Sequence, residues 1–186
     1  MSEQNHHNNG LTSDSPKDFS QYCRDIPDFP KEGIIFRDIT TLLQNGPVFK
    51  RAIDEIASHY SSTNIDAVVC IDARGFIIGA ALAYRLGCGL VPVRKKGKLP
   101  WKVFRKSYEL EYGQDELEIH QDAIAPGQNV LIVDDVIATG GTVEAVVNLI
   151  KEMNGNIVGI AFLIELTGLN GHQKIKDIPR FSLISY

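Results

Sequence analysis

Apolar runs and polar segments alternate along most of this chain, and their spacing predicts strands and helices that follow one another. Short apolar runs rich in β-branched residues lie between turn residues and are typical of buried strands, at 67–71, 90–94, 130–133, 157–164 and 181–185. Apolar residues recur at helical spacing over 47–60, 76–86 and 142–153. Because the order strand, helix, strand occurs twice, we predict an α/β fold with a mostly parallel central sheet and helices on both of its faces.

Two segments outside this pattern are expected to form an antiparallel pair. Residues 108–112 and 116–120 alternate polar and apolar side chains, which is typical of half-exposed strands. Residues 95–106 are predicted to be a mobile loop. Residues 1–20 are polar and rich in Asn and Ser, so we expect a disordered N-terminal extension before a single domain at 21–186.

Composition limits the classes of protein to which the chain can belong. Apolar residues make up 44% and charged residues 23% of the 186 residues, as in a globular domain. The net charge of -4 argues against general binding to nucleic acid or to membranes, and no apolar run reaches the roughly 18 residues of a membrane span. The three cysteines show no CxxC spacing and the five histidines are scattered, so neither a disulfide framework nor a histidine metal site is indicated. We therefore expect a cytoplasmic protein.

The junction between the strand at 130–133 and the helix after it carries the strongest chemical signal. Asp134 and Asp135 follow the strand directly, at the sheet edge where parallel sheets bind ligands. The segment 138–142 (ATGGT) opens the helix, where free backbone N–H groups and glycines form a phosphate cradle. Carboxylates beside such a cradle suit the two hydroxyls of a ribose, or a hydrated Mg²⁺. The predicted ligand is a ribose 5-phosphate; carboxylates that merely cap the helix are the alternative.

Two other phosphate-binding motifs are excluded. No GxxxxGK[ST] occurs in the chain, so there is no Walker-type loop. The GCG at 87–89 lacks the third glycine of a dinucleotide fingerprint and precedes a strand.

The stretch VLIVDDVIATGGT at 130–142 resembles the phosphoribosyl-pyrophosphate signature of the type I phosphoribosyltransferase family. Further segments are similar, in the same order, to the adenine-specific members of that family: PDFPKEGIIFRDIT (27–40), DARGF (72–76), RKKGKLP (94–100), YELEYG (108–113) and ELEIHQDAI (116–124). The resemblance covers about residues 24–186. It implies purine salvage, in which adenine and phosphoribosyl pyrophosphate give AMP and pyrophosphate with Mg²⁺. It also implies a small N-terminal hood, a mobile catalytic loop and a homodimer.

The resemblance assigns residues to the sugar phosphate and to pyrophosphate. The 5-phosphate and ribose would be bound by Asp134, Asp135, Ala138, Thr139, Gly140, Gly141 and Thr142. Mg²⁺ would be held mainly through the substrate, with the two aspartates as candidate protein ligands. The turn after the strand at 67–71 would carry a non-proline cis peptide between Asp72 and Ala73 and present Arg74 to pyrophosphate; a surface salt bridge is the alternative for Arg74.

Seven basic residues and no acid lie between 94 and 106. The resemblance favours pyrophosphate as their partner, with Lys98 as the direct contact in the neighbouring subunit's site and Arg94 sharing this role. The sequence does not decide whether Lys98 acts in its own subunit or in its neighbour's. Nucleic acid and a solvated charged surface are the other interpretations of this basic segment.

The resemblance also places a closing loop and a base pocket. Glu111 and Tyr112 would close over the site, with Glu111 stabilising an oxocarbenium-like transition state or contacting the purine N7. The exposed face of a strand is the alternative for Glu111. Phe36 would stack on adenine, the main chain of Ile35 and Arg37 would contact its edge, and Leu166 would lie on its other face; a core position is the alternative for Phe36.

Two alternative functions follow from the same fold. One is a phosphoribosyltransferase for another base. The members that use 6-oxopurines resemble this chain at the signature, but they have an aspartate at the position of Ala138. The other is a non-enzymatic regulator that senses phosphoribosyl pyrophosphate. Such regulators carry an added DNA-binding module. Residues 1–24 are too short and too polar for one, which counts against this alternative.

Overall fold

The computed structural model of the protein describes residues 18–109 and 114–186. Its elements are, in order, η1 (Ser20–Tyr22), β1 (Arg24–Pro27), β2 (Ile35–Asp38), α1 (Thr40–Gln44), α2 (Gly46–His59), β3 (Ala67–Ile71), α3 (Gly75–Leu86), β4 (Gly89–Lys95), β5 (Val103–Glu109), β6 (Gln114–His120), β7 (Asn129–Ile137), α4 (Gly141–Glu152), β8 (Asn156–Glu165), η2 (Thr167–Leu169), η3 (Gly171–Ile175) and β9 (Arg180–Ser185). In this part of the chain no helix combines the length and the apolar character needed to cross a membrane.

A seven-stranded sheet of order β5-β6-β4-β3-β7-β8-β9 forms the centre of the molecule. The five adjacent strands β4, β3, β7, β8 and β9 are parallel, whereas β6 runs antiparallel to both β4 and β5. The mostly parallel sheet predicted from the repeated strand, helix, strand order is therefore confirmed, as is the antiparallel pair.

Helices cover both faces of the sheet, as predicted. Along β7, Val130 and Ile132 pack in the core beneath α4, and Leu131 and Val133 pack in the core beneath α2 and α3. Successive strand residues point to opposite faces, so a strand buried on both sides is apolar at every position. This explains why these strands were visible in the sequence as uninterrupted apolar runs.

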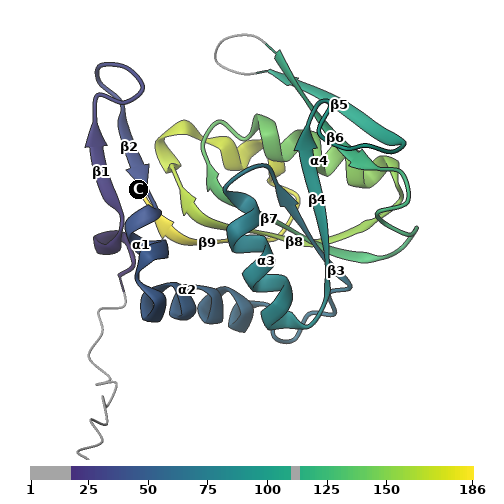
Figure 1. Cartoon of the computed structure of the whole chain (residues 1–186), viewed down its shortest axis with the longest axis horizontal. Coiled ribbons are helices and arrows are strands. Elements are labelled where there is room, and N and C mark those ends of the chain that lie inside the picture. The colour runs from purple at the N-terminus through teal and green to yellow at the C-terminus, as the bar shows by residue number, and fades with distance from the viewer. Residues whose placement is uncertain (1–17, 110–113) are drawn as a thin grey trace, which may run out of the picture.

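A two-stranded antiparallel pair, β1 with β2, stands apart from the main sheet and forms the expected hood (Figure 1). Phe19, which precedes the predicted domain start at residue 21, is only 5% exposed and packs in the core with α2. A single apolar residue within a polar segment gives no periodic signal, so the sequence pattern did not indicate this contact.

The strand predicted at 130–133 is longer than expected. Pairing with β3 ends at Val133, but pairing with β8 continues as far as Ile137. Asp134 and Asp135 therefore lie inside β7, in a part of the strand that has a neighbour on one side only. The prediction that they follow the end of the strand is wrong in this detail, because the sequence of one strand does not reveal how far its neighbour extends.

The mobile loop predicted at 95–106 is shorter than expected. The strand β4 continues to Lys95, and β5 begins at Val103, which pairs with His120. The basic side chains of Arg105 and Lys106 concealed this strand, because they replace the apolar residues by which a strand is recognised. The loop that remains is 96–102.

Candidate active site

Three connections meet at the carboxyl ends of the parallel strands. They are the turn at 72–74 after β3, the segment at 138–140 between β7 and α4, and the segment that follows β8 from Leu166 to Gly171. The adjacency of β3, β7 and β8 in the sheet brings these connections together. Open parallel sheets bind ligands at this edge, and the predicted residues 72–74 and 138–140 lie there.

The connection between β7 and α4 contains the residues of the predicted anion cradle. Gly140 adopts the left-handed conformation with φ of +78° and caps the N-terminus of α4. A pocket of ≈ 80 Å³ opens here, lined by Asp134, Val136, Ile137, Ala138, Thr139, Gly140, Thr142 and Val143. The free N–H groups and the positive end of the helix dipole face an anion at such a position.

A second glycine, which the sequence analysis did not identify, supports this cradle from behind. A Cβ atom on Gly140 would lie 2.4 Å from the carbonyl oxygen of Gly171, and one on Gly171 would lie 2.2 Å from the carbonyl oxygen of Ala138. Neither position has room for a side chain, so the segment after β8 sets the shape of the predicted cradle. The TGLNG stretch at 167–171 is a turn-like signal that could have indicated this contact.

The two aspartates are stabilised in different ways. Asp135 is 6% exposed and forms an ion pair with Nε of Arg74, the residue that precedes α3. The carboxylate of Asp134 accepts a 2.9 Å hydrogen bond from the backbone N–H of Asp135. Burial raises the pKa of Asp134 well above its usual range, and the negative charge of Asp135 raises it further. Asp135 is thus paired with an arginine, whereas the ionisation of Asp134 is costly.

The turn after β3 contains the expected cis peptide between Asp72 and Ala73. Asp72 accepts a 3.2 Å hydrogen bond from Nε of Arg94, which lies on the neighbouring strand β4. Arg94 also donates through Nη1 to the carbonyl oxygen of Lys98, at 3.4 Å. The predicted pyrophosphate residues of the turn and of the basic loop are therefore linked through Arg94.

The predicted base segment lies next to this turn. The guanidinium of Arg74 lies 5.4 Å above the ring of Phe36 on β2, so the hood and the turn after β3 are in contact. Ile35, the neighbour of Phe36 on β2, is 49% exposed. The alternative for Arg74 was a surface salt bridge. Arg74 does form a salt bridge, but its partner is the buried Asp135 between the cradle and this turn.

Tyr186 connects the two predicted walls of the base pocket, and the sequence analysis missed it. The guanidinium of Arg37 lies 4.0 Å from the centre of the Tyr186 ring, and Asp25 forms an ion pair with the same arginine. The main-chain oxygen of Tyr186 accepts hydrogen bonds from the N–H and the hydroxyl of Thr167, the residue after Leu166. Leu166 itself is held by a 3.0 Å hydrogen bond from its N–H to the carbonyl oxygen of Ile137.

Glu111 and Tyr112 lie outside the described residues, so their predicted roles remain predictions. The strand that leads to them ends near the start of α4, because Tyr108 on β5 lines one pocket together with Gly141 and Glu144. Burial raises the pKa of Tyr108, with the nearby Asp115 as the next cause.

The donor groups favour a divalent cation that brings most of its own ligands. Within the described ranges no three His, Cys, Asp or Glu side chains form a metal-binding group. Asp134 and Asp135 supply two carboxylates, and one of these is paired with Arg74. Mg²⁺ is commonly held by one or two carboxylates together with substrate phosphates and water, so these residues fit a substrate-bound Mg²⁺ and do not form a closed protein cage.

Comparisons with known proteins agree with this geometry. The family model described as a phosphoribosyl transferase domain matches residues 40–181. The adenine phosphoribosyltransferase of Trichlorobacter lovleyi is 56% identical over 170 residues, which are 91% of this chain and 99% of that protein. The crystal structure of adenine phosphoribosyltransferase from Thermoanaerobacter pseudethanolicus is 48% identical, has a TM-score of 0.87, and covers 89% of this chain and 96% of its own. That of Trypanosoma brucei, in complex with AMP, pyrophosphate and ribose-5-phosphate, is 25% identical, has a TM-score of 0.84, and covers 94% of this chain and 82% of its own.

Replacing Gly140 with alanine should weaken binding of ribose 5-phosphate. The added Cβ meets the backbone of Gly171, and the left-handed conformation costs an L-residue roughly 1–2 kcal/mol, so the cradle must open. We expect at least about tenfold weaker affinity by titration calorimetry. Gly46→Ala is the control, because its Cβ would meet no atom within 4 Å. Equal affinity in Gly140→Ala and Gly46→Ala would mean that the cradle does not bind the phosphate.

Replacing Asp134 with asparagine should stabilise the ligand-free protein at neutral pH. A raised folded-state pKa means that stability falls as pH rises from the usual aspartate pKa of about 4 through the raised value. Asparagine removes this cost and keeps the acceptor for the Asp135 N–H. Denaturant unfolding at pH 7 should therefore give a higher unfolding free energy than the wild type, and the gain should disappear below about pH 4.

Asp38 provides a control of opposite sign for this measurement. Hydrogen bonds from the backbone and the hydroxyl of Thr40 lower the pKa of Asp38, so Asp38→Asn should lose stability at pH 7. A less stable Asp134→Asn variant at pH 7 would show that the ionised carboxylate is not a burden in the free protein.

Proposed function

The chain belongs to the phosphoribosyltransferase family, and we propose that it transfers the 5-phosphoribosyl group of phosphoribosyl pyrophosphate to adenine, giving AMP and pyrophosphate in purine salvage. The observation that carries this proposal is the junction of β7 and α4, where two carboxylates lie beside a glycine cradle at a helix N-terminus. The relative from Trichlorobacter lovleyi, which is 56% identical and matched over 99% of its length, supports adenine as the base.

The sugar phosphate is proposed to bind at this junction. The 5-phosphate lies in the cradle of residues 138–142, whose N–H groups and threonine hydroxyls donate to its oxygens. Asp134 and Asp135 accept hydrogen bonds from the two ribose hydroxyls. Hydrogen bonds to a charged acceptor contribute roughly 1.5–3 kcal/mol, which offsets the cost of keeping two carboxylates side by side.

The pyrophosphate group lies toward the turn after β3. Arg74 can pass from Asp135 to pyrophosphate, because both partners are anionic and the arginine is half exposed. This exchange releases Asp135 to accept a ribose hydroxyl. Arg94 and Lys98 add positive charge from the basic loop. Whether Lys98 contacts pyrophosphate in its own subunit or in the neighbouring one is left open.

Mg²⁺ is the proposed cofactor, held mainly by substrate oxygens with Asp134 and Asp135 nearby. When bound, it neutralises charge on the leaving pyrophosphate. The protein's own part is to orient the substrate: the cradle fixes the 5-phosphate, and the carboxylates fix the ribose.

The reaction exchanges one bond at the anomeric carbon for another. The bond from C1 to the pyrophosphate oxygen breaks, its electron pair leaves with pyrophosphate, and N9 of adenine forms the new bond and loses its proton. Positive charge develops on the sugar, as in glycoside chemistry. We assign stabilisation of that charge, or a contact with the purine N7, to Glu111, and closure of the site to Tyr112.

Glu111→Gln should then lower kcat more than it raises either KM; a change confined to KM would count against this role.

Adenine is proposed to lie between Phe36 and Leu166. Main-chain groups of Ile35 and Arg37 contact its edge, so a carbonyl acceptor meets the exocyclic amine. The oxygen of a 6-oxopurine would face this carbonyl oxygen, and both groups are acceptors. One buried polar group would stay unpaired, which costs about 1–3 kcal/mol or more of binding free energy. Ala138 supplies no carboxylate toward N7.

A homodimer is proposed from the surface of α3. Ile77 and Tyr84 are 44% and 91% exposed on this helix, and Leu90 on the adjoining strand β4 is 44% exposed. Apolar side chains exposed on one helix and on the strand beside it suit an interaction surface, and a twofold axis would bury the same surface on both subunits.

A competition assay tests the proposed function. The protein should form labelled AMP from adenine and phosphoribosyl pyrophosphate with Mg²⁺, and should use hypoxanthine and guanine with a kcat/KM at least about tenfold lower. Comparable efficiency on hypoxanthine would point to another base. Binding of phosphoribosyl pyrophosphate without any nucleotide product would point to a regulator.

The oligomeric state tests the α3 surface. The double variant Ile77→Asp with Tyr84→Asp should sediment as a monomer while the wild type sediments as a dimer, because two charges cannot be buried unpaired in the interface. Leu169→Asp is the control, since Leu169 is exposed elsewhere, in η2. A monomeric wild type, or a double variant that remains dimeric, would contradict the proposed interface.

A further inference from the structure

Glu118 on β6 is a fully buried carboxylate that the proposed reaction does not use. It is 0% exposed, and among the described residues the only other buried charged side chains are Asp135 and Glu165. A carboxylate is kept away from water only where partners compensate the loss of hydration. The partners of Glu118 therefore indicate what it holds.

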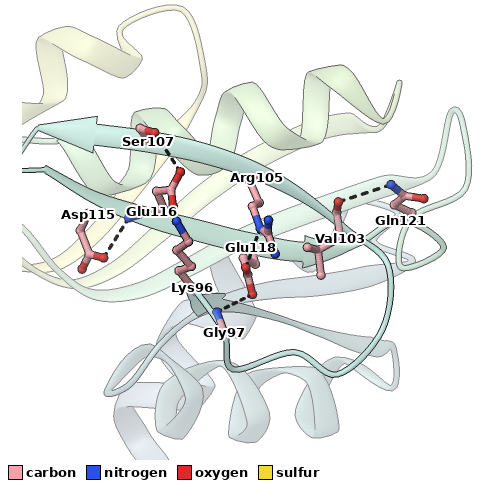
Figure 2. A network of polar contacts seen from close by, with 9 residues as sticks. All are labelled: Lys96, Gly97, Val103, Arg105, Ser107, Asp115, Glu116, Glu118 and Gln121. Carbon is pink, nitrogen blue, oxygen red and sulfur yellow. Dashed lines mark hydrogen bonds and ion pairs between the residues drawn. The ribbon is translucent and has the colours of Figure 1, made fainter.

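Both oxygens of the Glu118 carboxylate are engaged, and each connects to a different segment. Oε2 accepts a 3.0 Å hydrogen bond from the backbone N–H of Gly97, at the start of the basic loop 96–102. Oε1 accepts a 2.7 Å hydrogen bond from Nε of Arg105 on β5, just after that loop. Figure 2 shows the carboxylate between these two donors, so a single side chain ties together both ends of the loop.

The strand register explains how one residue reaches both segments. Glu118 pairs with Arg94 of β4 on one side and with Arg105 of β5 on the other. Paired residues on neighbouring strands point to the same face, so the carboxylate lies between two arginines. That face is opposite to the one on which Leu117 and Ile119 pack in the core beneath α4.

The anchored loop carries the proposed pyrophosphate contact. Lys98 follows Gly97 directly, its N–H donates to the carbonyl oxygen of Lys95 at 3.2 Å, and its own carbonyl oxygen accepts from Arg94. Arg94 in turn binds Asp72 in the turn after β3. The backbone at residues 97 and 98 is thus held from one side by Glu118 and from the other by Arg94.

We propose that Glu118 is a positioning residue, which fixes the basic loop through Gly97 and Arg105 so that Lys98 is presented to pyrophosphate. It does not touch the substrate; it acts by restricting the loop before the substrate binds. Holding a flexible cation in place removes part of the ordering cost of binding. This inference rests on the proposed function, since it concerns affinity for pyrophosphate and for phosphoribosyl pyrophosphate.

A second glutamate on the same strand offers a matched comparison. Glu116 lies two residues before Glu118 and so faces the same side, but its carboxylate pairs with the exposed ammonium of Lys96 and lies 3.4 Å from the hydroxyl of Ser107 (Figure 2). Exposed ion pairs of this kind contribute little. Neutralising Glu116 removes the same charge from the strand without releasing the backbone of Gly97.

The test compares Glu118→Gln with Glu116→Gln in the full-length protein. Glutamine keeps the size of the side chain but cannot accept from Gly97 and Arg105 at once. Glu118→Gln should raise KM for phosphoribosyl pyrophosphate and the inhibition constant of pyrophosphate about tenfold, with KM for adenine changed less than about twofold. Glu116→Gln should change none of these by more than about twofold. An equal effect of both variants, or an equal rise of both KM values, would overturn the proposal.

A double-mutant cycle identifies Lys98 as the residue that Glu118 positions. In a Lys98→Gln background, Glu118→Gln should add less than about twofold to KM for phosphoribosyl pyrophosphate, since residues that act together are not additive. Full additivity would mean that Glu118 acts on something other than Lys98.

Gly97→Ala keeps the question decidable if Glu118→Gln folds poorly. Gly97 has φ of +78°, where an L-residue is disfavoured, but a Cβ there would meet no atom within 4 Å. It should raise the same KM about threefold without loss of folding, and an unchanged KM would overturn the proposal.

If the wild type forms no AMP, the proposed function fails, and amide hydrogen exchange then decides whether Glu118 anchors the backbone of Gly97. The N–H of Gly97 should exchange faster in Glu118→Gln than in the wild type, and equal rates would refute the anchor.

Discussion

The juxtaposition of Asp134 and Asp135 is the constraint around which the site is organised. Two adjacent carboxylates inside a strand repel one another, and burial makes the ionisation of Asp134 harder still. The structure accommodates them with one ion pair, from Arg74 to Asp135, and with a raised pKa for Asp134. An arrangement that is costly in the free protein points to a ligand that brings compensating donors, and a ribose with two hydroxyls supplies them.

The same constraint explains why several loops must meet at this point. The positive charge that balances Asp135 comes from the turn after β3, and the anion cradle comes from the turn after β7. The cradle is closed from behind by Gly171, from the segment after β8. Rigid parallel strands place the three segments, while the loops themselves carry the chemistry. The site is therefore a property of the sheet edge, and no single motif contains it.

Much of this arrangement could be predicted from the sequence, but contacts between distant segments could not. Apolar runs located the parallel strands, and the DD and GG pairs located the junction of β7 and α4, where the ligand site is proposed. The extension of β7 to Ile137 depends on its neighbour β8, and the burial of Glu118 depends on a loop that folds over it. Gly171 and Tyr186 likewise gain their importance from what lies opposite them. Local patterns show periodicity and motifs; they do not show which residues face each other.

The central claim is that the two aspartates bind the ribose hydroxyls of phosphoribosyl pyrophosphate. Its most direct test is the affinity of the Asp134→Asn and Asp135→Asn double variant, measured by titration calorimetry with phosphoribosyl pyrophosphate and Mg²⁺. Each lost charged acceptor should cost roughly 1.5–3 kcal/mol of binding free energy. An affinity equal to that of the wild type would mean that the carboxylates do not contact the ribose, and would contradict this account of the site.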